Sequence, residues 1–195
     1  MKSRAIALII VFVAIVISLY PTFSGLAIPS FALGRYFQFW EIPIFAALLL
    51  FGLKYAVTIA ALDTVAIMIL FRSGPFTNWF NVIPFVGTML GVYLVRRIIV
   101  RRESEKEVLS KRKEISYSVV SGFLFRCLIG FPPFYLILRF LIQMPEPAIF
   151  TMSVTYAIHD AILVAYSVPA SYLIAEIIRK NLRIGIEAVS PASNS

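Results

Sequence analysis

The chain has 195 residues, of which 60% are hydrophobic and 14% charged, and its formal net charge is +8. A soluble domain is about half apolar and a quarter charged, so this composition excludes an ordinary soluble protein and indicates an integral membrane protein. The basic residues lie at the ends of apolar segments, which argues against nucleic acid as a partner. The single cysteine, Cys127, excludes an intrachain disulfide and a cysteine metal cluster.

The first apolar segment, about residues 5–20, follows Lys2 and Arg4 and is stopped by Pro21. We expect a retained membrane helix, with a signal peptide cleaved after small residues as the alternative. One face of this helix repeats small or β-branched residues at intervals of about four, which suits close packing against a second membrane protein. These residues are Ser3, Ala7, Val11, Ala14 and Ser18.

The second apolar segment, residues 43–53, is unusually short and follows the aromatic stretch RYFQFWEIP at residues 35–43. Eleven helical residues rise only about 16 Å, against about 30 Å for a hydrocarbon core. The segment therefore needs help from the aromatic stretch or leaves a cavity. Four further spans are expected at about residues 55–71, 80–95, 115–141 and 148–178.

The strongly polar stretch is residues 96–114, with eight Lys/Arg and four Glu. Short loops rich in Lys/Arg mark the cytoplasmic side, so the pattern predicts six spans with both termini in the cytoplasm. We expect an all-α, six-helix membrane bundle over residues 1–184 in the cell membrane, with a disordered tail at 185–195. The basic stretch is either a solvated connector or a docking surface for a cytoplasmic partner.

Ionisable residues within the spans are costly in a bilayer and each needs a partner or a wet cavity. Four such residues stand out: Asp63, Arg126, His159 and Asp160. Arg126 is expected to neutralise Asp63 or Asp160, to contact a ligand, or to do both. A lone buried histidine is more often a hydrogen-bonded core residue than a base.

Small residues and prolines suggest how the later spans pack. Gly87-x-x-x-Gly91 lines one helix face, as does the series Ala157, Ala161 and Ala165, and both patterns favour close helix contacts within the bundle. Pro84 and the pair Pro132-Pro133 free backbone carbonyls and bend helices. Bent outer halves of these helices, facing a short second helix, would form a pocket that opens outward.

Recognised catalytic motifs are missing from the sequence. It contains no G-x-x-x-x-G-K-[ST], no G-x-S-x-G and no H-E-x-x-H, so we expect no ATP site, no metal and no cofactor of its own. His159 and Asp160 are adjacent and point about 100° apart on a helix, which disfavours a catalytic dyad. The alternatives to a binding protein are a small intramembrane enzyme and a proton-coupled carrier that uses Asp63, His159 or Asp160.

The motifs EIP at 41–43 and FGLKY at 51–55, followed by the helix from Asn81 to Arg97, resemble the substrate-binding (S) components of energy-coupling factor (ECF) vitamin transporters. The resemblance implies a six-helix subunit that captures a vitamin outside the cell. It implies as partners a coupling transmembrane subunit and two ATPase subunits. The riboflavin-type components are the most similar over residues 41–97, whereas Asp63 is closer to pantothenate- or folate-type patterns.

In that family the loop between the first two helices covers the substrate, which would make residues 35–41 a lid whose aromatic rings stack on a flat vitamin. Membrane-interface anchoring is the alternative role for Trp40 and Trp79. The expected substrate-binding residues are Arg35, Gln38, Trp40, Glu41, Asn78, Trp79, Asn81, Arg126, Tyr156 and His159. The stripe on the first helix would be the docking face for the coupling subunit.

Overall fold

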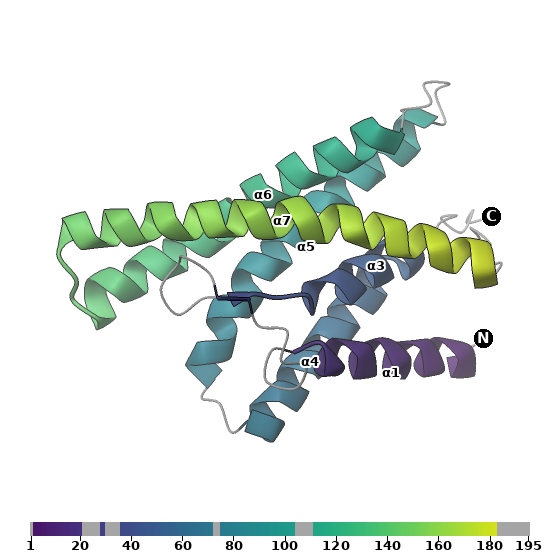
Figure 1. Cartoon of the computed structure of the whole chain (residues 1–195), viewed down its shortest axis with the longest axis horizontal. Coiled ribbons are helices and arrows are strands. Elements are labelled where there is room, and N and C mark those ends of the chain that lie inside the picture. The colour runs from purple at the N-terminus through teal and green to yellow at the C-terminus, as the bar shows by residue number, and fades with distance from the viewer. Residues whose placement is uncertain (1, 21–27, 30–35, 72–74, 104–110, 183–195) are drawn as a thin grey trace, which may run out of the picture.

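The computed structural model describes residues 2–20, 28–29, 36–71, 75–103 and 111–182, with only the backbone described at some element ends. Within this part the chain is helical apart from two short strands (Figure 1). The helices are α1 (Lys2–Ser18), α3 (Glu41–Phe51), α4 (Leu53–Phe71), α5 (Pro75–Glu103), α6 (Lys111–Leu136), the π-helix η1 (Ile137–Leu141) and α7 (Glu146–Leu182). The strands β1 (Ile28–Pro29) and β2 (Tyr36–Phe37) pair antiparallel.

Three of the described helical stretches are long and apolar enough to cross a membrane. They are Leu53–Leu70, Lys111–Leu141 and Glu146–Asn181, and α3 and part of α1 form shorter apolar helices. Large apolar side chains on their outer faces are widely exposed, for example Ile69 and Phe150 at 71% each. Exposed apolar surface of this extent is a liability in water and suits a lipid environment, which supports an integral membrane protein.

Helix α3 is the short second segment expected from the sequence, and it lies inside the bundle. Every residue from Glu41 to Leu50 is buried, and α3 packs against α1, α4, α5 and α7. A helix that is apolar all round is typical of such a central position. Gly52 separates α3 from α4, and its φ of 91° is a conformation that glycine adopts readily.

The C-terminal end of α3 is satisfied by arginines from two longer helices. Arg96 on α5 and Arg179 on α7 both donate to the carbonyl oxygen of Leu49, over 2.7 and 2.6 Å. The last carbonyls of a helix have no partner within it and carry partial negative charge, so cationic donors stabilise them. The C-terminal end of α3 is thus satisfied by cationic side chains of α5 and α7.

Helices α5 and α6 pack closely through the predicted glycine pair. A Cβ added at Gly87 would lie 2.5 Å from the Phe125 carbonyl oxygen, and one at Gly91 would lie 2.5 Å from that of Ser121. These distances are too short for any side chain. The contact expected from the G-x-x-x-G spacing is therefore confirmed, with α6 as the partner helix.

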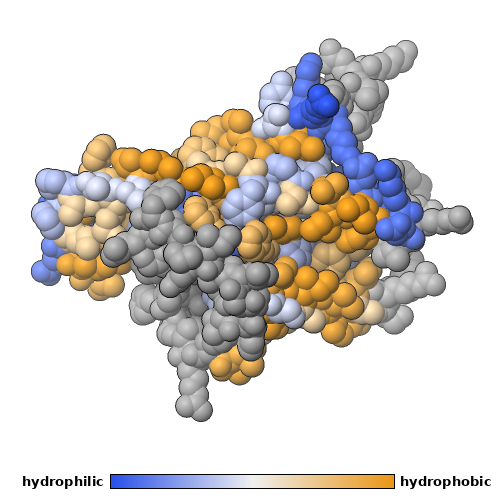
Figure 2. Space-filling view, in the orientation of Figure 1, coloured by the Kyte–Doolittle hydropathy of each residue, from blue (hydrophilic) through white to orange (hydrophobic). Residues whose placement is uncertain are grey.

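The end of α5, the start of α6 and the end of α7 lie at the same end of the molecule (Figure 1). Figure 2 shows hydrophilic residues at this end and hydrophobic residues across the middle of the view. Glu114 on α6 accepts a hydrogen bond from Tyr172 on α7 and lies 3.8 Å from Arg96, while Lys111 pairs with Glu176. The connection between η1 and α7 lies at the opposite end of the molecule.

Candidate functional site

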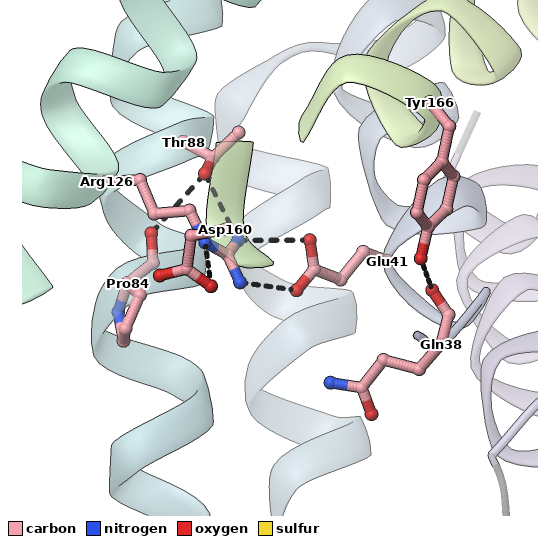
Figure 3. A network of polar contacts seen from close by, with 7 residues as sticks. All are labelled: Gln38, Glu41, Pro84, Thr88, Arg126, Asp160 and Tyr166. Carbon is pink, nitrogen blue, oxygen red and sulfur yellow. Dashed lines mark hydrogen bonds and ion pairs between the residues drawn. The ribbon is translucent and has the colours of Figure 1, made fainter. Parts of the chain in front are cut away.

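Four helices meet at a buried ion-pair network, which we call the Arg126 cluster and define as Glu41, Thr88, Arg126 and Asp160 (Figure 3). The guanidinium of Arg126 donates from Nη1 and Nη2 to the two carboxylate oxygens of Glu41, each over 3.1 Å. Its Nε lies 3.2 Å from Oδ1 of Asp160, and Nη1 also donates to the Thr88 hydroxyl over 3.3 Å. Arg126 is 1% exposed and Asp160 is 9% exposed.

Each member of the cluster is placed by its helix. Glu41 is the first residue of α3, where the partial positive charge of a helix N-terminus favours a carboxylate. Arg126 lies well inside α6, and Asp160 lies on α7. The Thr88 hydroxyl on α5 donates to the Pro84 carbonyl over 3.4 Å, one turn earlier in the same helix. One guanidinium therefore holds α3, α5, α6 and α7 together.

A pocket lies beside the cluster, between α5, α6, η1 and α7. Ser153, Tyr156, Ala157 and Asp160 recur at intervals of three and four residues, which places them on one face of α7. The remaining wall consists of Ile83, Pro84, Arg126, Cys127, Gly130, Phe131, Pro133, Phe134 and Ile137. The pocket is mainly apolar with a few converging polar groups, as is typical of small-molecule sites.

The end of the aromatic stretch packs on α7. The Gln38 carbonyl accepts a hydrogen bond from the Tyr166 hydroxyl over 2.7 Å, and the ring of Phe37 stacks on His159 with centroids 5.0 Å apart. Trp40 is 4% exposed and lies in the core, 5.3 Å from the ring of Phe85. These contacts fix the chain that enters α3, but Trp40 and Gln38 are not part of the pocket wall.

Comparisons of the chain with protein-family models, curated proteins and solved structures found no match. A function for this chain must therefore be inferred from its sequence and from the geometry of its residues.

The structure brings only some of the expected binding residues to the pocket. Arg126 and Tyr156 line it, and Glu41 lies behind it as a partner of Arg126. His159 faces Phe37 instead. Arg35 lies outside the described residues, and Asn78, Trp79 and Asn81 belong to α5 without described side chains.

The stripe on α1 lies on the outside of the bundle. Ala7, Val11, Ala14 and Ser18 are exposed, whereas Phe12 and Val16 on the other face are buried. The side chain of Ser3 is outside the described part of the chain. This face is accessible to lipid or to another protein.

The structure also decides between the expected partners of Arg126. Arg126 pairs with Asp160 and with Glu41, which was expected in the lid rather than in an ion pair. Asp63 lies elsewhere, 2% exposed on α4, and its Oδ1 has no hydrogen-bond partner among the described residues.

Sequence reasoning overlooked Thr88, Ser153 and the pocket aromatics Phe131 and Phe134. Ser153 and Tyr156 lie seven and four residues before Asp160, and this helical spacing is the signal that would have found the polar face of the pocket. Thr88 gave no such signal, because a threonine beside a small-residue packing motif is common.

Proposed function

We propose that the chain is the substrate-binding subunit of an ECF-type vitamin importer, with six membrane helices and both termini in the cytoplasm. The observation that carries the proposal is the pocket between α5, α6 and α7, with Arg126 and Asp160 in its wall. It lies away from the end of the molecule where the basic residues gather. With that basic end in the cytoplasm, the pocket falls in the outer half of the bundle, as capture from outside requires.

The resemblance of residues 28–97 to S components supplies the partners: a coupling membrane subunit and two ATPase subunits. The exposed stripe on α1 is the proposed docking face, since it lies on a helix whose opposite face packs on α3 and α4. Riboflavin is the first ligand to test, from the likeness of residues 41–97 to riboflavin-type components. The subunit would carry out no reaction, and ATP hydrolysis by the partners would drive release.

The test is a thermal-shift titration of the purified chain in detergent against riboflavin, thiamine, biotin, folate, pantothenate and cobalamin. A ligand at about 1,000 times its Kd adds about 4 kcal/mol of apparent stability by mass action. We expect one vitamin to give a shift of this order. The Ala157→Trp variant, which fills the pocket, should abolish the shift, since Ala157 lines the wall.

Val154→Trp is the matched control, because Val154 lies on the same helix but is 43% exposed outside the pocket. It should leave the shift unchanged. An unchanged shift in Ala157→Trp would show that the vitamin binds elsewhere, and no shift with any vitamin would overturn the proposed function.

One observation favours a second candidate, a proton-coupled carrier. Asp63 is buried on α4 with an oxygen that has no partner among the described residues, and such a carboxylate within a membrane is a candidate proton site. Vesicles that contain this chain alone distinguish the two functions. A carrier would accumulate the vitamin when a proton gradient is imposed and lose that uptake on Asp63→Asn, whereas a binding subunit would transport nothing without its partners.

A further inference from the structure

Basic side chains outnumber acidic ones at the end of the molecule where α5 ends, α6 begins and α7 ends. Residues 96–97, 111–114 and 176–180 contain seven Lys/Arg and two Glu. Both glutamates already have basic partners, since Glu176 pairs with two lysines and Glu114 lies beside Arg96. Arg97 and Lys113 are exposed, and no ion pair of the described chain includes them. This end therefore carries positive charge that the described residues do not neutralise.

Arg97 on α5 and Lys113 on α6 lie at the same level of the bundle. The two glycine contacts between these helices show that they run antiparallel, and they set the register. Continued along both helices, this register places Arg97 level with residue 115, between Lys113 and Tyr117. The approach of Arg96 to Glu114 agrees with it.

These exposed residues also lie on one side of the contact between α5 and α6. A Cβ at Gly122 would meet Val92 of α5 and a valine of α7, so α7 covers one side of the contact. Arg97 is five residues from Val92, and Tyr117 is five residues from Gly122. Five residues rotate a helix position by about 140°, which turns Arg97 and Tyr117 away from α7 and toward the outside.

Below the cations, α6 exposes a continuous apolar face. Tyr117, Val120, Leu124 and Leu128 recur at intervals of three and four residues, and each is between 54% and 68% exposed. From Tyr117 to Leu128 the helix rises about 16 Å, which is about half of a hydrocarbon core of about 30 Å. A tyrosine between basic residues and an apolar face is typical of the headgroup level of a membrane.

From this arrangement we propose that the outer face of α5 and α6 binds an anionic phospholipid, with its phosphate between Arg97 and Lys113 and its acyl chains along residues 117–128. Charge complementarity selects the occupant, because basic residues beside membrane helices favour anionic headgroups over zwitterionic ones. An acidic protein at the membrane surface would meet the cations but not the apolar side chains below them. This face is separate from the pocket, so the lipid site does not depend on the proposed function.

A tryptophan placed at Leu124 reports a lipid on this face. The Leu124→Trp protein, in a neutral detergent, is titrated with phosphatidylglycerol or phosphatidylcholine that carry the same brominated acyl chains, which quench nearby tryptophans. The wild-type chain, titrated in parallel, corrects for its own two tryptophans. Each basic residue near an anionic lipid contributes about fivefold in affinity, so phosphatidylglycerol should reach half-quenching at a concentration at least about tenfold lower.

Ile69→Trp is the control for position. Ile69 is 71% exposed on α4, near the end of that helix far from Lys54 and the basic residues. A tryptophan there should be quenched equally by the two lipids. Glycerol phosphate, added at the concentration of the lipid, should not relieve the quenching of Leu124→Trp. Relief by this soluble anion would assign the cations to a soluble phosphate compound and overturn the lipid site.

The cations are tested by Arg97→Gln and Lys113→Gln, each combined with Leu124→Trp. Each should weaken phosphatidylglycerol by about fivefold and leave phosphatidylcholine unchanged. Both residues are exposed and outside the ion pairs of the described chain, so the lipid-free unfolding temperature should not change.

Lys180→Gln is the matched control, because it removes the same charge at the same end of the molecule. Lys180 lies on α7, is 76% exposed at its side chain and already pairs with Glu176. It should leave both titrations unchanged. Equal quenching of Leu124→Trp by the two lipids would overturn the inference, and so would an equal loss in Lys180→Gln, since a general attraction to the basic end would then account for the preference. Neither result bears on vitamin binding.

Discussion

Arg126 is the residue on which the interior of the bundle depends. Its guanidinium is 1% exposed and bonded to Glu41 in a bidentate geometry, the strongest arrangement that an arginine and a carboxylate form. Asp160 and Thr88 take further contacts from the same group. A buried ion pair contributes little net stability over an apolar substitute, but the loss of one partner leaves the other charged and desolvated.

Replacement of Arg126 by Met should therefore destabilise the protein strongly. Two buried carboxylates lose their cation, and breaking a buried pair costs about 3–5 kcal/mol in the free energy of unfolding. The measurement is equilibrium or thermal unfolding of the purified chain in detergent.

Arg139→Met is the matched control. Arg139 also pairs with a glutamate, Glu146, at 3.3 Å, but the two side chains are 42% and 57% exposed. Exposed ion pairs are worth at most about 1 kcal/mol, so this variant should unfold close to the wild type. Equal loss of stability in the two variants would show that the Arg126 cluster has no special structural role.

At this scale the sequence identifies the charged residues but not their pairing. Arg126 and Asp160 are recognisable because charge within an apolar segment requires a partner. The pairing role of Glu41 cannot be recognised in this way, because Glu41 stands at the edge of an apolar run, six residues after Arg35, where a solvated role is as reasonable. Its burial becomes apparent only once α3 is known to begin inside the bundle.

At the scale of elements, hydropathy and turn residues predict most helices and the short α3. The second segment was expected at 43–53, and α3 runs from Glu41 to Phe51. The fourth was expected at 80–95, but α5 runs from Pro75 to Glu103. The uncharged residues 75–79 extend it at the N-terminal end, and residues 96–103, which include four arginines, extend it at the C-terminal end. Hydropathy identifies only the apolar part of a helix, so it underestimates such ends.

The close contact between α5 and α6 can be tested by adding a side chain to one of its glycines. Gly91→Ala would place a Cβ 2.5 Å from a backbone carbonyl of α6, and backbone cannot move aside as the end of a side chain can. The two helices would have to separate, at a cost of about 1–3 kcal/mol, as for other overpacked interiors. Thermal unfolding in detergent measures the loss.

Gly122→Ala on α6 is the comparison for this variant. The nearest atom to a Cβ there is a methyl of Thr88 at 3.2 Å, which belongs to a side chain and can adjust. We expect its effect to be clearly smaller than that of Gly91→Ala. A larger loss for Gly122→Ala would mean that the glycine at position 91 does not set the distance between the helices.

For the whole molecule, the distribution of charge argues for an orientation in the membrane. Lys54, Arg96, Lys113 and Arg179 lie where α4 begins, α5 ends, α6 begins and α7 ends. The carbonyl of Leu49 on α3 joins two of these helices, α5 and α7, through Arg96 and Arg179. Arg139 lies toward the opposite end. Such asymmetry is typical of proteins whose basic end stays in the cytoplasm.

Labelling of single cysteines tests that orientation. Cys127 is first replaced by alanine, and a cysteine is then introduced at Lys113 or Glu146, which are exposed at opposite ends of α6–α7. A membrane-impermeant maleimide should label the Glu146→Cys protein in intact cells, because that end faces outward in the proposed orientation. It should label the Lys113→Cys protein only after permeabilisation. Labelling of both cysteines in intact cells would rule out a bundle that crosses the membrane between these ends, and the reverse pattern would place the pocket half on the cytoplasmic side, where capture from outside is impossible.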